Sequence, residues 1–120
     1  MSDEGLLPLL RRKAVEVMRS VDPDREPPLA GCCVEVSLLV RAVCGGEVVH
    51  GTFDGEDHYW NKLDNGNEID LTSDQYGGDG WSPVAVGAPA LLPTLTPLRS
   101  LFFARMVASS LRGPTPGEKP

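Results

Sequence analysis

The segment from residue 32 to residue 44 constrains the fold most, because its apolar side chains recur at helical spacing on almost every face. A helix that is apolar nearly all round is a buried helix, so the rest of the chain must pack around it. The proline-rich residues 22–28 precede this segment and Gly45-Gly46 follow it, and neither stretch favours a continuing helix. We therefore predict a helix over about residues 32–44 at the centre of the fold.

Two further segments predict helices that flank this central one. Residues 5–20 carry apolar side chains at helical spacing on one face and charged side chains on the other. Thr96-Pro97 is typical of a helix start and predicts a C-terminal helix that ends near residue 111. A chain of 120 residues is long enough for one core, so we predict a single domain over residues 1–112 and a disordered tail over residues 113–120.

Between these helices the sequence favours antiparallel strands. Residues 47–52 predict a short strand, and residues 57–63 and 67–72 predict a hairpin around Asp64-Asn65-Gly66. Residues 73–93, which are rich in glycine and proline, predict a long loop of the kind that often has a function. The predicted fold class is therefore α+β.

The register of the predicted hairpin decides whether two polar side chains can meet. A two-residue turn would pair Leu63 with Glu68 and place His58 and Asp70 on opposite faces. A three-residue loop would pair Leu63 with Asn67 and place His58 and Asp70 diagonally on one face. We predict the second register, because it separates polar from apolar side chains better and one buried face specifies register strongly.

Composition excludes some classes of protein. The net charge of -6 argues against a protein that binds nucleic acid, and no apolar run approaches the ~20 residues that span a bilayer. The acidic residues 1–5 do not resemble a secretory signal, and the odd number of cysteines does not favour a disulfide framework. We expect a cytoplasmic protein with no nucleic-acid or membrane partner.

Three side chains could form a cysteine nucleophile site. Cys33 opens the predicted central helix, His58 begins the first hairpin strand and Asp70 lies on the second. The thiolate is the attacking form of cysteine, an imidazole can take the thiol proton, and a third polar group can orient the imidazole. Amides at a helix N-terminus favour an anion and could hold a developing oxyanion.

The residues themselves leave alternatives open. Cys32 could be the nucleophile instead of Cys33, or both could be small buried apolar side chains. His50 is a second candidate base, although no acid follows it at hairpin spacing, and Cys44 is expected in the core. Asn61 could orient the histidine, but its predicted face is the wrong one.

Several nearby side chains are candidates for a substrate pocket, namely Cys32, Trp60, Gln75 and Trp81. Adjacent cysteines lack the spacing that zinc sites usually show, and no glycine-rich loop follows a strand and opens a helix. We therefore expect no metal and no cofactor.

The spacing of several motifs resembles the YunG family of small bacterial proteins. The resemblance covers about residues 31–76 and rests on Gly31-x-Cys33, Gly45-Gly46-Glu47, His58-Tyr59-Trp60-Asn61 and Asp64-x-Gly66-x-Glu68-Ile69-Asp70-Leu71-Thr72-x-x-Gln75-Tyr76. It implies a minimal papain-like fold, similar to the NlpC/P60 and transglutaminase-like groups. Carried over by position, it makes Cys33 the nucleophile, His58 the base and Asp70 the orienting acid. The family tends to carry glutamine where this chain has Cys32, so the resemblance implies an altered oxyanion hole.

These observations predict a Cys33–His58–Asp70 triad that transfers an acyl group through a thioester. Water as acceptor would make the protein a peptidase or amidase, which we slightly favour, and an amine would make it an acyltransferase or an amide-forming biosynthetic enzyme. A non-catalytic accessory module and a thiol redox sensor that uses Cys32 and Cys33 are the alternatives. The expected partner is a small-molecule or peptide acyl substrate, and a second protein chain could complete the site.

Overall fold

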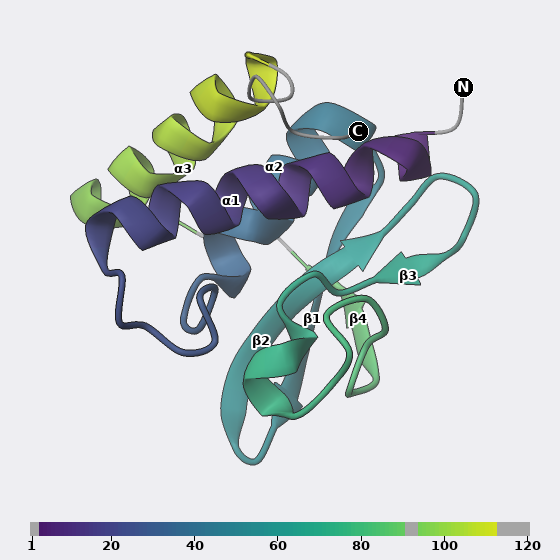
Figure 1. The fold of residues 1–120 in the computed structure, drawn as a ribbon. Helices are drawn as coiled ribbons and strands as arrows, with labels where there is room; N and C mark the ends of the chain where they lie inside the picture. Colours follow the sequence, from purple (N-terminus) through teal and green to yellow (C-terminus); the bar gives the residue numbers. More distant parts are fainter. Residues whose placement is uncertain (1–2, 91–93, 113–120) are drawn as a thin grey trace.

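The computed structural model describes residues 3–90 and 94–112, which form three helices and one sheet (Figure 1). The predicted tail and residues 91–93 of the predicted loop lie outside the described residues. In chain order, the elements are η1 (Asp3–Leu6), α1 (Leu7–Val21), α2 (Cys33–Cys44), β1 (Glu47–Phe53), β2 (Glu56–Lys62), β3 (Glu68–Ile69), η2 (Ser73–Tyr76), β4 (Gly87–Pro89) and α3 (Pro97–Leu111).

The three helices lie close to where the sequence predicts them. α1 ends immediately before the proline-rich segment, whose rings cannot continue a helix. α3 begins at Pro97 and is capped by Thr96, whose hydroxyl accepts a hydrogen bond from the amide of Arg99 at 3.3 Å. None of the helices in residues 3–90 and 94–112 is long and apolar enough to cross a membrane.

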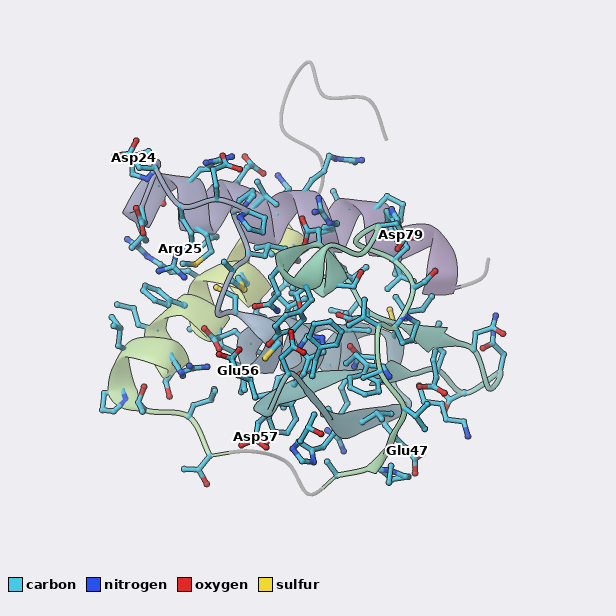
Figure 2. The ribbon with its side chains drawn as sticks, turned by 90° about the horizontal axis from the view of Figure 1, so that it is seen from below. Asp24, Arg25, Glu47, Glu56, Asp57 and Asp79 are labelled. Carbon is cyan, nitrogen blue, oxygen red and sulfur yellow. The ribbon has the colours of Figure 1, made fainter. Side chains whose placement is uncertain are left out.

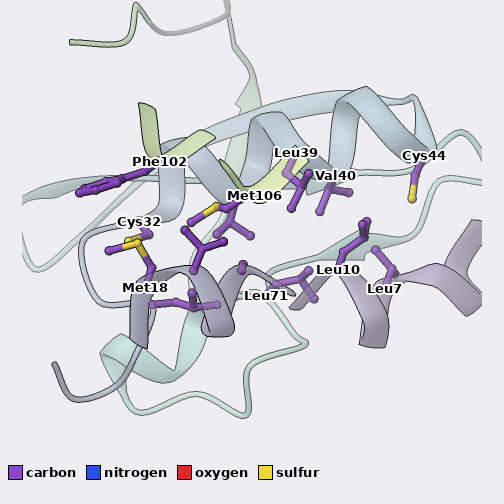
Figure 3. Close-up of a cluster of buried hydrophobic side chains, with 14 of the residues drawn as sticks. Leu7, Leu10, Met18, Cys32, Leu39, Val40, Cys44, Leu71, Phe102 and Met106 are labelled. Atoms are coloured by element: carbon purple, nitrogen blue, oxygen red, sulfur yellow. The ribbon is translucent and has the colours of Figure 1, made fainter. Parts of the chain in front are cut away.

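α2 is the central helix of the fold, as predicted. It contacts α1 and α3 on one side and β1 and β2 on the other, and Leu39 and Val40 are completely buried. Its last turn differs from the prediction of an all-round buried helix, because Val43 is 36% exposed. The core joins all three helices to the strand ends (Figure 3) and contains Leu7, Leu10, Ala14, Val17, Met18, Leu29, Cys32, Val36, Leu39, Val40, Cys44, Leu63, Leu71, Phe102 and Met106.

The sheet has four antiparallel strands in the order β3-β2-β1-β4. β1 and β2 form a hairpin closed by Asp54 and Gly55, which have positive φ values of 51° and 80°. An Asp-Gly pair in this conformation is typical of a tight hairpin turn. The pairing of these two strands was not predicted from the sequence, nor was β4, which lies inside the predicted loop.

The predicted register of the β2–β3 hairpin is confirmed, since Leu63 donates its amide to the carbonyl of Asn67 at 2.8 Å. The second strand is shorter than predicted, because β3 ends at Ile69. The amide of Asp70 donates to the carbonyl of Trp81 at 2.9 Å instead of to β2. β2 therefore pairs with β3 only at Asn61 and Lys62, and this pairing does not extend to His58.

Burial of the two hairpin faces differs from the prediction of one polar and one apolar face. His58 and Trp60 are 0% and 1% exposed, because the segment between β3 and β4 packs over them (Figure 1). A Cβ atom added at Gly51 or Gly87 would lie 2.7 or 2.8 Å from the Trp60 ring. These glycines therefore let two strands approach the buried indole closely.

Candidate active site

Cys33 is the first residue of α2 and is partly buried. The chain turns into the helix at Gly31, whose φ of +76° is one that glycine adopts easily. The N-cap residue Cys32 makes no side-chain capping hydrogen bond. No side chain of the N-cap therefore competes for the amides of the first helical turn, where the helix dipole favours a negative charge.

His58 and Asp70 form a buried pair. His58 Nε2 donates to Asp70 Oδ2 at 2.6 Å, and the two side chains are 0% and 1% exposed. The other carboxylate oxygen, Oδ1, accepts from the amide of Thr72 at 3.1 Å and from its hydroxyl at 3.3 Å. Both oxygens of this buried carboxylate are thus hydrogen-bonded, as burial of a charge requires.

Cys33 lies near the same imidazole and affects its pKa. Burial alone would lower the pKa of His58, but the hydrogen bond to Asp70 and the proximity of Cys33 outweigh it and raise this pKa to about 9. Since Asp70 takes Nε2, the ring nitrogen that remains for Cys33 is Nδ1. Within the described residues, Nδ1 is buried and has no hydrogen-bond partner of standard geometry. The structure thus brings the three predicted side chains together in the order Cys33, His58, Asp70.

Tyr76 is a site residue to which the sequence analysis gave no role. Its ring packs edge-on against His58 with centroids 4.8 Å apart, and it also contacts Phe53 at 4.7 Å. Burial and the nearby Cys33 both raise the pKa of the Tyr76 hydroxyl, which lies 3.5 Å from Glu56 Oε2. Glu56 is labelled in Figure 2, which views the molecule from below. An aromatic residue in a long loop was the available signal, but only the β1–β2 hairpin explains its contacts.

Cys32 lies in the core (Figure 3). It is 1% exposed, and its sulfur lies 3.7 Å from both Arg25 Nη1 and the carbonyl oxygen of Ala30. Burial, followed by the nearby Glu35 carboxylate, raises the pKa of Cys32 to about 11. The expectation that Cys32 lines a pocket is therefore wrong, and its thiol is a poor candidate nucleophile.

Trp60 and Trp81, the two predicted pocket walls, occupy different environments. Trp60 is buried, 5.5 Å from His58 between ring centroids, and its Nε1 donates to Glu68 Oε1 at 2.7 Å. Trp60 therefore packs beside His58 inside the protein, and its assignment to a substrate pocket stays a prediction. The Trp81 side chain is 38% exposed, while its carbonyl holds the amide of Asp70.

Gln75, another predicted pocket residue, is hydrogen-bonded to the turn that precedes Cys33. Its Oε1 accepts from the amide of Gly31 at 3.1 Å, and its Nε2 donates to Thr72 Oγ1 at 3.1 Å. The side chain thus bridges the turn before α2 and the turn after Asp70.

The alternative residues have other roles. His50 Nε2 donates to Asp57 Oδ1 at 2.8 Å on the surface, a pair that the sequence analysis missed because it did not pair β1 with β2. Asn61 Nδ2 donates to the carbonyl of Ser37 at 2.8 Å and so ties β2 to α2. Its face is the wrong one for orienting His58, as predicted, and Cys44 is in the core, also as predicted.

Two shallow cavities lie away from Cys33. One of about 360 Å³ lies between α1 and α3, and one of about 330 Å³ lies beside His50 and Tyr59. Within residues 3–90 and 94–112, no group of three or more His, Cys, Asp and Glu side chains could hold a metal ion.

Comparison with known proteins gives one family. No curated protein and no solved structure matches the chain. The family model described as YunG protein matches residues 18–89, which is more than half of the chain and includes Cys33, His58 and Asp70. The chain therefore belongs to the YunG family.

Proposed function

We propose that this protein is a papain-like cysteine enzyme that transfers acyl groups, with Cys33 as nucleophile, His58 as acid and base, and Asp70 as the group that orients His58. The observation that carries the proposal is the 2.6 Å hydrogen bond from His58 to Asp70, together with the effect of Cys33 on the same ring. A nucleophile, a base and an orienting group linked in this way are the parts of a nucleophilic catalytic site.

The reaction would begin with the transfer of the Cys33 proton to His58 Nδ1. The thiolate attacks the carbonyl carbon of an amide or thioester, and a C–S bond forms. The bond to the leaving amine or thiol then breaks, and His58 donates its proton to that leaving group. An acceptor, water or an amine, loses a proton to His58 and attacks the thioester, which releases the acyl product and restores the Cys33 thiol.

The first turn of α2 would stabilise the oxyanion that forms during attack. Its uncapped amides and the positive end of the helix dipole lie beside the attacking sulfur. No side chain at residue 32 would assist them, because Cys32 is in the core. The oxyanion hole would therefore consist of backbone amides.

Both acceptors fit this chemistry, and we favour water, which makes the protein a peptidase or amidase acting on a peptide or small-molecule acyl substrate. Residue 32 is a buried cysteine and not a polar side chain that could help bind the oxyanion. This favours a second candidate function, an accessory module that keeps the fold but does not catalyse a reaction. The buried Cys32 thiol, with its pKa raised to about 11, argues against a redox sensor that pairs it with Cys33.

The activated ester p-nitrophenyl acetate tests the proposal without knowledge of the natural substrate. We expect a burst of nitrophenolate and one acetyl group on Cys33, located by mass spectrometry of the digested protein. Cys33→Ala should abolish both, whereas Cys44→Ala, which changes a buried thiol, should retain both. Acetylation that is absent from the wild-type protein, or that persists in folded Cys33→Ala, would contradict the proposal and favour the accessory module.

A further inference from the structure

A chain of hydrogen bonds joins the two halves of the candidate site behind the reacting atoms. Asp70 holds His58 with one oxygen and the Thr72 hydroxyl with the other. Thr72 Oγ1 accepts from Gln75 Nε2, and Gln75 Oε1 accepts from the amide of Gly31. Gly31 precedes Cys33 by two residues, so the chain of bonds leads from the histidine back to the cysteine.

The hydrogen bond between Gln75 and Gly31 joins two segments that are distant in the sequence. Gly31 and Gln75 are 44 residues apart in the sequence. Gly31 lies in the turn that leads into α2 and Cys33, and Gln75 lies in the turn that follows Asp70. Within the described residues, the other hydrogen bonds of this turn are local: the amide of Ala30 donates to the carbonyl of Pro27, the amide of Cys32 to the carbonyl of Leu29, and Arg25 Nη1 to the carbonyl of Ala30. The Gln75 amide therefore supplies a long-range constraint on the position of the turn before α2.

We propose that Gln75, acting through Thr72, is a positioning residue that fixes the Cys33 thiol against His58. The inference rests on the proposed function, because it concerns the same sulfur and imidazole. A displacement of about 1 Å in a reacting group can cost on the order of a hundredfold in rate. Gly31 is exposed, so without the Gln75 bond its amide would bond to water and the turn would be held by local contacts.

Replacement of the Gln75 amide tests the proposal. Gln75→Met keeps the length of the side chain but removes both hydrogen bonds, whereas Gln75→Glu keeps an acceptor for the Gly31 amide. We expect Gln75→Met to slow iodoacetamide alkylation of Cys33 by roughly tenfold, within the range for a misplaced reacting group, and Gln75→Glu to recover part of the rate. Ser82→Ala is the control, since it removes an exposed hydroxyl from the same segment and should leave the rate unchanged.

A purely structural role is distinguished by combining the change with His58→Gln. If Gln75 acts by placing Cys33 against His58, Gln75→Met should slow alkylation in the wild-type background and have no further effect once His58 is replaced. An equal slowing in both backgrounds, or no slowing in the wild-type background, would overturn the proposal. Equal rates in wild-type protein and His58→Gln would instead mean that the proposed function itself has failed, and the positioning role with it.

Thr72 gives an independent variant for the same connection. It is 1% exposed, so Thr72→Val keeps the buried volume and removes the hydroxyl that joins Asp70 to Gln75. We expect Thr72→Val to slow Cys33 alkylation and Thr72→Ser, which restores a hydroxyl, to recover it. Wild-type alkylation rates in folded Thr72→Val would contradict the role of this link.

Discussion

The imidazole of His58 and the carboxylate of Asp70 lie 2.6 Å apart and are almost completely shielded from water. A second histidine–aspartate pair, His50 and Asp57, has a similar length of 2.8 Å but side chains that are 38% and 73% exposed. One small domain thus contains a buried and an exposed example of the same interaction, and their consequences should differ.

Removal of the acid from each pair should separate the two environments. Asp70→Ala leaves His58 buried without its partner and should lower the free energy of unfolding by about 3–5 kcal/mol. Asp57→Ala breaks the exposed pair and should cost about 0–1 kcal/mol. Urea unfolding followed by circular dichroism measures both, and a similar small loss in the two variants would show that the Asp70 pair does not stabilise the fold.

The pH dependence of stability should reveal the buried histidine. The pKa of His58 is raised from 6.5 to about 9 in the folded protein, so between these values the folded state binds more protons than the unfolded state. Its contribution is therefore complete below pH 6.5 and is lost as the pH rises through 9. Asp70 and Cys33 are the acidic groups that raise this pKa.

This loss can be measured from urea unfolding at several pH values between 6 and 9.5 (roughly the span of the shift). His58→Gln should remove most of the decline in stability over that range. The pKa of Cys32 is raised from 9.0 to about 11, so its contribution to stability is lost at higher pH, between these two values. A decline that persists unchanged in His58→Gln would assign it to another group.

Close packing around Trp60 predicts that Gly51 cannot accept a side chain. A Cβ there would lie 2.7 Å from the indole and 2.8 Å from the carbonyl oxygen of Val86, so Gly51→Ala should destabilise the protein by about 1–3 kcal/mol. Gly5 has no atom within 4 Å of an added Cβ, and Gly5→Ala should change stability by at most about 0.5 kcal/mol. Thermal unfolding of both variants provides the comparison, and wild-type stability of Gly51→Ala would argue against this packing.

The sequence predicted the positions of the helices and the register of one hairpin because these depend on local patterns. Apolar spacing identifies α2, and Thr96-Pro97 identifies the start of α3. The three-residue loop that pairs Leu63 with Asn67 followed from which faces could be buried. This register brings His58 and Asp70 to the same side of the sheet.

What the sequence did not predict depends on contacts between distant segments. β4 and the turn at Tyr76 contain few apolar residues of their own, and their positions are set by Gly51 and His58 on other strands. Cys32 and Cys33 are adjacent, so only the orientation of the helix start decides which sulfur enters the core. The burial of Trp60 was not predicted, because it depends on a distant segment that packs over the hairpin.

Alkylation kinetics of the three cysteines test the central claim most directly. In the folded protein at neutral pH, iodoacetamide should modify Cys33 before the buried Cys32 and Cys44, and His58→Gln should slow that modification by at least about tenfold. After unfolding in urea, the three thiols should react at similar rates. Modification of Cys32 before Cys33, or a Cys33 rate that is the same in folded wild-type protein and folded His58→Gln, would contradict the account.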